Sequence, residues 1–275
     1  MRRTADRNTA LSIAGLDPSG GAGILADVKT FALMGVYGMA VQAASTVQNT
    51  VGVLSVGPRP VRTVMKELDT LIEDIRPDAL KVGMLYSAGA VSAVADAIKR
   101  HSLDNLVIDP LIISSSGKRL LEKDALERLI GELFPLAVVV MPNVAEAEAL
   151  SGMEIRSIGD AEEAARKIRR LGPKYVVVKG GHLQGGRSTG GGASSVEPMC
   201  GYAVDVLFDG KNFTRFSAQR IEKEIHGAGC VYSAAITAGL AKGLAVEEAV
   251  RAAKEFISEA IRLARPVGRG RVPIV

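Results

Sequence analysis

The feature that most constrains the fold is the alternation, along most of the chain, of short apolar runs with amphipathic segments. Several runs are too apolar to leave one strand face in water, as in a parallel sheet that is covered on both sides. Strands are predicted near 10–14, 36–44, 79–83, 105–109, 137–141 and 174–179. Helices are predicted near 22–34, 60–75, 88–101, 122–133, 143–151 and 160–171. This order predicts an α/β protein with a central, mostly parallel sheet.

The pattern changes after residue 181. The segment 185–195 (GGRSTGGGASS) has the composition of a flexible loop. The runs 203–208 and 212–216 predict a hairpin that turns at Asp209-Gly210, and helices are expected near 228–242 and 246–264. Because the Gly/Ser run interrupts one alternating pattern rather than separating two compositions, the whole chain, 1–275, is expected to form a single domain.

Composition narrows the class of protein. The chain has 275 residues, 47% of them hydrophobic, and no apolar run reaches the length of a membrane span. Net charge is +4, but basic residues alternate with acidic ones, as in 161–170, so neither a nucleic acid nor a membrane is expected as partner. The start, MRRTADRNTA, lacks the apolar core of a secretory signal, so we expect a cytoplasmic protein. Cys200 and Cys230 show no disulfide or zinc spacing.

Two nucleotide-binding motifs can be excluded. Gly21, Gly23 and Ala26 fit G-x-G-x-x-A, but no acidic residue lies between Asp27 and Glu67 to hold a ribose. The Gly117-Lys118-Arg119 fragment lacks the hydroxyl and the earlier glycine of a Walker A loop. Function is instead sought after the strands, where ligands gather in doubly wound sheets.

A glycine-rich turn precedes the apolar helix near 228–242. Gly227, Ala228 and Gly229 lie where a helix start leaves amides without intrahelical partners, which suits a phosphoryl group. Cys230, in the first turn, would feel the helix dipole, and this predicts a lowered thiol pKa and a possible proton acceptor. The alternative is an ordinary turn followed by a buried cysteine that serves as a small hydrophobe.

Three residues of the N-terminal half are candidate ligand contacts. Asp27 flanks an apolar helix stripe and needs a partner, a polar ligand or access to solvent. Gln48 follows a strand and could hydrogen-bond an amino-substituted ring, or only stabilise its turn. Met84 could lie against a flat ring or fill the core.

Five further candidates lie at or just after the ends of later strands. Asn143 and Glu146 could meet magnesium, although an N-terminal capping box is the favoured interpretation. Asp109 ends a buried strand, where an acid suggests function. Lys179 could pair with phosphate or extend to solvent, and His182 could bind a ligand or cap a turn.

The motifs in this order resemble those of the hydroxymethylpyrimidine kinase/hydroxymethylpyrimidine phosphate kinase family, a branch of the ribokinase-like superfamily. They are AGLDPSGGAGILADVKTF, YGMAVQAASTVQNTVGV, KVGML, VIDP, SSSG, MPNVAEAEAL, VVKGGH, DVLFDG and HGAGC, with VGRGRVP as the tail. The resemblance spans nearly the whole chain. It implies a ribokinase-like αβα sandwich, usually a homodimer, that uses ATP and Mg²⁺ to phosphorylate 4-amino-5-hydroxymethyl-2-methylpyrimidine and its monophosphate for thiamine biosynthesis.

The resemblance also implies roles for particular residues. The positions that match pyrimidine contacts are Gly15, Asp27, Gln48, Met84 and Leu111, the last in place of a common valine. The turn Gly227-Ala228-Gly229 matches the anion hole, and Cys230 matches the proposed base. Magnesium is assigned to Asn143 and Glu146, with Asp109 as a further candidate, and the nucleotide to Lys179, Gly181 and His182.

The chain also departs from the family pattern. The usual N-T-H-G-T-G-C reads E-I-H-G-A-G-C at 224–230, and Val231 replaces a further threonine, so hydroxyls and an amide are missing around the phosphates. Two alternatives follow. The chain could be a pyridoxal kinase, because pyridoxine also carries a hydroxymethyl group, or a pyrimidine-binding regulator without turnover.

Overall fold

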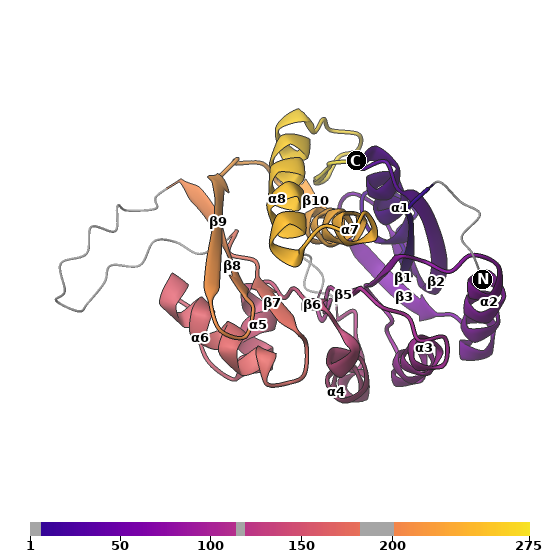
Figure 1. Cartoon of the computed structure of the whole chain (residues 1–275). Helices are drawn as coiled ribbons and strands as arrows, with labels where there is room; N and C mark the ends of the chain where they lie inside the picture. Colours follow the sequence, from indigo (N-terminus) through magenta and orange to yellow (C-terminus); the bar gives the residue numbers. More distant parts are fainter. Residues whose placement is uncertain (1–6, 114–118, 182–200) are drawn as a thin grey trace.

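The computed structural model describes residues 7–113, 119–181 and 201–275. One nine-stranded sheet runs through them in the order β3-β2-β1-β4-β5-β6-β7-β8-β9 (Figure 1). Its strands are β1 Thr9–Leu16, β2 Tyr37–Gln48, β3 Val53–Pro58, β4 Ala79–Val82, β5 Leu106–Ile108, β6 Val139–Val140, β7 Tyr175–Val178, β8 Tyr202–Phe208 and β9 Phe213–Gln219. The six central strands, β2-β1-β4-β5-β6-β7 in sheet order, are parallel. β3 pairs with β2 in antiparallel fashion at one edge, and at the other edge β8 is antiparallel to both β7 and β9.

Helices cover both faces of the sheet, so the predicted αβα sandwich is confirmed. One core lies beneath α2 Val61–Asp74, α3 Ala88–Arg100, α4 Lys123–Arg128, α5 Val144–Ser151 and α6 Ile158–Arg169. The other lies beneath α1 Gly23–Leu33, α7 Ala228–Ala241 and α8 Val246–Leu263 (Figure 1). Every residue of α7 from Cys230 to Ala241 is buried, because α7 packs against the sheet, α1 and α8.

Element boundaries differ from the predictions in a few places. The strand expected at 36–44 continues to Gln48 and turns into β3, which the sequence did not reveal. β3 is mostly exposed and ends in Gly57-Pro58, so it lacks the apolar run that marks the inner strands. The helix expected at 122–133 ends as α4 at Arg128 and continues as a π turn, Leu129–Leu133, and a 3₁₀ turn, Phe134–Leu136. The hairpin at Asp209-Gly210 is confirmed.

The C-terminal tail folds back against the strand that precedes α7. Its short strand β11, Val272–Pro273, pairs in parallel with β10, Ile225–His226, immediately before α7. The amides of Gly270 and Arg271 donate to Thr50, in the β2–β3 turn. The tail therefore connects the β2–β3 hairpin to the strand that leads into α7. In the described part of the chain, no helix is both long and apolar enough to cross a membrane.

Candidate active site

The start of α7 presents a row of backbone amides. The first intrahelical bond is donated by Val231 to the Gly227 carbonyl at 3.0 Å, so the amides of Ala228, Gly229 and Cys230 precede it. Gly227 caps the helix with φ of 81°, and a side chain there would overlap the Gly21 carbonyl. The close approach of the β1–α1 loop thus requires glycine at 227. Free amides at a helix start are suited to an anion, so the anion hole at 227–229 stays a prediction.

The predicted lowering of the Cys230 pKa is wrong. Cys230 is 6% exposed, and burial raises the pKa of its thiol to about 11. Lys81 and the Gly23 amide act in the opposite direction, but Asp27 and other nearby carboxylates offset much of that attraction. The helix dipole is too weak to overcome desolvation at a fully buried sulfur. Cys230 is therefore a thiol at neutral pH in this structure.

Asp27 is fully buried, so the expectation that its carboxylate might reach solvent is also wrong. It accepts a hydrogen bond from Ser12 Oγ at 2.6 Å and pairs with Lys81 Nζ at 2.5 Å. Burial tends to lower the pKa of Lys81, but the facing carboxylate raises it, so the lysine stays charged. Lys81 was not predicted as a site residue, because it stands within the otherwise apolar strand β4. A lysine at an inward position was itself the available signal.

The predicted substrate residues Gly15, Met84 and Leu111 lie close together near the carboxyl ends of β1, β4 and β5. A side chain on Gly15 would overlap the Met84 thioether, so Gly15 makes room for Met84. Met84 is 5% exposed and packs with Leu111 and Leu120 in a small separate cluster. These contacts are apolar and suit the face of a ring. No ligand is needed to explain them, because Met84 also fills space.

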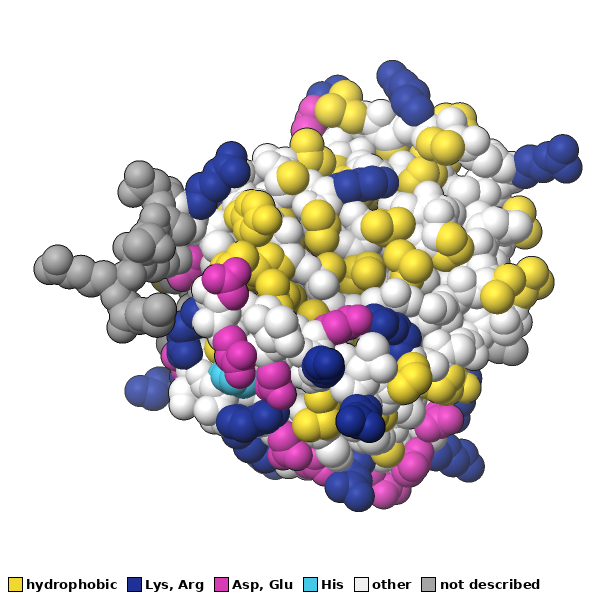
Figure 2. Space-filling model, turned by 90° about the vertical axis from the view of Figure 1, so that its right-hand side faces the viewer, with side chains coloured by type: hydrophobic (Ala, Val, Ile, Leu, Met, Phe, Trp, Pro, Cys, Tyr) yellow, Lys and Arg dark blue, Asp and Glu magenta, His cyan; other side chains and the backbone are white. Residues whose placement is uncertain are grey.

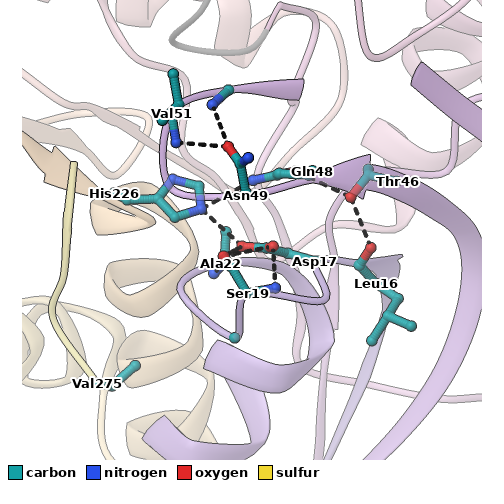
Figure 3. A network of polar contacts seen from close by, with 12 residues as sticks. Leu16, Asp17, Ser19, Ala22, Thr46, Gln48, Asn49, Val51, His226 and Val275 are labelled. Atoms are coloured by element: carbon teal, nitrogen blue, oxygen red, sulfur yellow. Dashed lines mark hydrogen bonds and ion pairs between the residues drawn. The ribbon is translucent and has the colours of Figure 1, made fainter. Parts of the chain in front are cut away.

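Gln48 belongs to a polar network between the β2–β3 hairpin and β10 (Figure 3). Its amide nitrogen lies 3.0 Å from His226 Nε2, and its Oε1 lies 3.1 Å from Thr46 Oγ1. His226 Nε2 also lies 2.7 Å from Asp17 Oδ2. Neither Asp17 nor His226 was among the predicted site residues, although Asp17 lies in AGLDPSGG and His226 in HGAGC.

Lys179 and Asp109 form a second ion pair, with Nζ 2.5 Å from Oδ1. Asp109 is completely buried, and Ser233 Oγ of α7 lies 3.5 Å from its other oxygen. Burial works against the charge of Lys179, but Asp109 and Glu146 raise its pKa. Gly181 lies two residues further along the chain. The predicted His182 lies outside the described residues.

Asn143 and Glu146 form a capping box at the start of α5, which confirms the favoured interpretation. The Glu146 amide donates to Asn143 Oδ1 and the Asn143 amide to Glu146 Oε2, each at 2.9 Å. The second oxygen, Oε1, makes no well-formed hydrogen bond. The nearby backbone amide of Ile112 acts to lower the pKa of the Glu146 carboxyl group. Burial raises the pKa of Glu146 to about 7, against the attraction of Lys179.

One carboxylate oxygen is thus available to a cation. In the described residues, no cluster of three His, Cys, Asp or Glu side chains forms a ready metal cage. Magnesium commonly uses one or two carboxylates together with phosphate oxygens and water, so Glu146 fits an ion that arrives with a nucleotide. Asp109 fits less well, because Lys179 already neutralises it.

A three-layer sandwich, whose strand ends surround a helix start with free amides and two buried ion pairs, is that of a small-molecule kinase of the ribokinase-like class. Comparison with known proteins gives the family. The chain belongs to the phosphomethylpyrimidine kinase family, whose model matches residues 17–275. It is therefore a member of a phosphotransferase family.

Relatives support this placement. The chain is 42% identical over 262 residues to the hydroxymethylpyrimidine/phosphomethylpyrimidine kinase of Aquifex aeolicus, covering 95% of this chain and 97% of that protein. It is 42% identical over 269 residues to a thiamine biosynthesis bifunctional protein of Geobacter sulfurreducens, covering 98% of this chain but 52% of that protein. The ADP complex of Bacillus subtilis pyridoxal kinase has a TM-score of 0.82 and 39% identity, covering 98% of this chain and 96% of that one.

Proposed function

We propose that the chain transfers a phosphoryl group from ATP to 4-amino-5-hydroxymethyl-2-methylpyrimidine and then to its monophosphate, a step of thiamine biosynthesis. The observation that carries the proposal is the start of α7. There, free amides lie beside Lys179, since a Cβ added to Gly229 would be 3.3 Å from Lys179 Nζ. Family membership supplies the reaction class, and the Aquifex relative carries the substrate in its name.

The proposed chemistry depends on positioning and charge. Phosphoryl transfer spreads negative charge over the oxygens of the moving group, so fixed donors at that place stabilise the transition state. The α7 amides and the Lys179 ammonium would supply them. Glu146, with Asn143 holding its other oxygen, would bind magnesium, which neutralises phosphate charge when present. Gly181 and His182 remain predicted nucleotide contacts.

Cys230 is proposed to accept the hydroxymethyl proton. Only the thiolate can do so, and burial makes it scarce at neutral pH. The proton leaves late in a loose transition state, when the hydroxyl oxygen has become acidic, so a small thiolate population can serve. Gln48, Met84, Leu111 and Gly15 are proposed to surround the pyrimidine, with Asp27 holding Lys81 behind them.

The proposed function is tested by measuring ADP release by the purified chain with the aminopyrimidine, followed by mass detection of mono- and diphosphate. Both products are expected. A second candidate is pyridoxal kinase activity, which the 39% identity to the Bacillus enzyme favours, so pyridoxal belongs in the same assay. Binding of the aminopyrimidine without ADP release would support a regulator instead.

We also propose that the chain forms a homodimer. The β2–β3 hairpin exposes apolar side chains, with Val47, Val51 and Leu54 at 58%, 68% and 73% exposure. Figure 2 views the side of the molecule that carries this hairpin, where hydrophobic side chains gather over the upper half. Light scattering that gives the mass of one chain would contradict the dimer.

A further inference from the structure

A single ring nitrogen of His226 faces two incompatible partners. Nε2 lies 2.7 Å from Asp17 Oδ2 and 3.0 Å from Gln48 Nε2 (Figure 3). A carboxylate can only accept a hydrogen bond, and a carboxamide nitrogen can only donate one. His226 Nε2 cannot donate to the first and accept from the second at the same time.

A second conflict lies at the other end of the same amide. Thr46 Oγ1 lies 3.0 Å from the Leu16 carbonyl and 3.1 Å from Gln48 Oε1, and both of these oxygens are acceptors. A hydroxyl has one hydrogen to donate. With the amide of Gln48 in this orientation, one of the two Thr46 contacts is also left without a proton.

Reversing the carboxamide of Gln48 removes both conflicts. The two ends of the group have nearly the same shape, so the hydrogen-bond network decides its orientation. After reversal, His226 Nε2–H donates to Asp17 and is shared with Gln48 Oε1. The amide nitrogen then donates to Thr46 Oγ1, and Thr46 donates to the Leu16 carbonyl.

Asp17 determines that His226 is the donor in the hydrogen bond between them. It also accepts from the Ser19 amide at 2.8 Å and from the Ala22 amide at 2.9 Å, so it presents acceptors to every neighbour. Burial acts to raise the Asp17 pKa, but hydrogen bonds from His226 and Ser19 lower it overall. An ionised Asp17 requires a proton on the His226 nitrogen that faces it.

We infer that His226 and Thr46 together fix the order in which Gln48 presents its amide N–H and its carbonyl oxygen, which makes His226 a specificity-determining positioning residue. The inference rests on the proposed function in that Gln48 faces the pyrimidine. An aminopyrimidine carries an amino donor beside a ring-nitrogen acceptor. An amide held in one orientation complements that pair, whereas pyridoxal has no amino substituent to match it.

The fold holds the imidazole in place. A Cβ on Gly21 would lie 2.5 Å from His226 Cδ2, so the β1–α1 loop packs directly on the ring. The backbone of His226 is held as well, because β10 pairs with the C-terminal strand β11. The side chain of His226 is 13% exposed. The ring therefore connects the hairpin that carries Gln48 to the β1–α1 loop that carries Asp17. His226 itself directly precedes the glycine-rich turn at 227–229.

The first experiment reads the His226 tautomer by ¹⁵N NMR and does not depend on any activity. The chain has three histidines, and the signals that disappear in the His226→Gln variant are those of His226. The inference expects hydrogen on Nε2, in a neutral ring or an imidazolium. A neutral ring with its hydrogen on Nδ1 overturns it.

The second experiment measures binding of the aminopyrimidine and of pyridoxal by calorimetry to wild type, His226→Leu and His226→Gln. Loss of the orienting donor in His226→Leu should weaken aminopyrimidine binding about tenfold, with pyridoxal changed less than about twofold. His226→Gln, which keeps an N–H donor near the same place, should recover most of the loss. Equal weakening of both ligands, or no weakening, overturns the inference. If wild type does not bind the aminopyrimidine, the proposed function fails. The His226 tautomer measured by NMR then still decides the orientation of the Gln48 amide.

Discussion

Lys179 Nζ lies 2.5 Å from Asp109 Oδ1, beside the first turn of α7. A Cβ on Gly229 would be 3.3 Å from both Lys179 Nζ and Asp109 Oδ2, so the pair lies directly against the first turn of α7. The side chain of Lys179 keeps 12% exposure, while Asp109 has none. The lysine can therefore offer its remaining hydrogens to an anion that the turn binds, without leaving Asp109 unpaired.

Replacing Lys179 by Met should lower kcat about 10²- to 10³-fold, the effect of losing one donor to a developing charge. Steady-state ADP release measures it. Lys174→Met is the matched control, because Lys174 is an exposed lysine just before the same strand. A kcat for Lys179→Met within about twofold of the control variant would remove the proposed role. Thermal unfolding should accompany the kinetics, because Asp109 loses its partner.

If the Cys230 thiolate accepts the proton, kcat should rise with pH throughout the neutral range. Burial raises the pKa of this thiol to about 11, so the thiolate fraction grows about tenfold for each pH unit below that value. Cys230→Ser should lose about 10²-fold in kcat and show a flat profile over the same range. A flat wild-type profile, or an unchanged kcat in Cys230→Ser, would exclude Cys230 as the base.

The same pKa shift predicts an effect on stability. The folded-state pKa of Cys230 is raised above that of an exposed thiol, so its contribution to stability is present below about pH 9 and is lost as pH rises toward about 11. The free energy of unfolding of wild type should fall relative to Cys230→Ser over this interval. Parallel curves for the two proteins would show that the thiol is not desolvated.

Glu146 makes a second pH-dependent contribution. Burial raises its pKa to about 7, so the stability linked to its proton is present below about pH 4.5 and is lost as pH rises through about 7. Glu146→Gln can retain the capping box without titrating. The variant should gain up to about 3 kcal/mol relative to wild type between about pH 5 and pH 8, measured by urea unfolding. No gain would mean that Glu146 is ionised throughout.

Magnesium dependence separates the two roles of Glu146. If its Oε1 holds the ion, Glu146→Gln should need about tenfold more Mg²⁺ for half-maximal activity, the loss expected from one weakened ligand. Chelation of Mg²⁺ should abolish turnover in both proteins. An unchanged Mg²⁺ requirement in the variant would place the ion elsewhere.

Gly227→Ala tests the turn itself. Gly227 and Gly243 have φ of 81° and 83°, but only at Gly227 would a Cβ meet the backbone, at the Gly21 carbonyl. Both substitutions carry the strain of a left-handed residue, about 1 kcal/mol. Gly227→Ala should in addition lose at least about 10²-fold in kcat because the amides move. Equal activity of the two variants would contradict an anion site at this turn.

Much of the fold follows from the sequence because its signals are local. The inner strands are apolar runs, and Asn143 with Glu146 carries the capping box in four consecutive residues. β3 could not be found this way, since its residues are exposed and it is defined by pairing with β2. The same holds for β11, whose two residues acquire a partner only when the tail folds back on β10.

The sequence predicted which positions belong to the candidate site, but not which of their side chains contact each other. Lys81 and Asp27 are 54 residues apart and meet because α1 packs on β1, whose neighbour β4 carries Lys81. The raised pKa of Cys230 depends on its burial by the surrounding layers, which the first-turn position does not reveal. The local sequence pattern thus located the glycine-rich turn at which we propose an anion site, and tertiary packing decides the ionisation of the groups around it.

The most direct test of the proposed function compares kcat/KM of the purified wild-type chain, with ATP and Mg²⁺, for the aminopyrimidine, its monophosphate and pyridoxal. Phosphorylation of the aminopyrimidine and its monophosphate, each with a kcat/KM at least about tenfold above that of pyridoxal, is the predicted result, a preference equivalent to about 1.4 kcal/mol. A higher kcat/KM for pyridoxal, or no ADP release with any of the three, would contradict it.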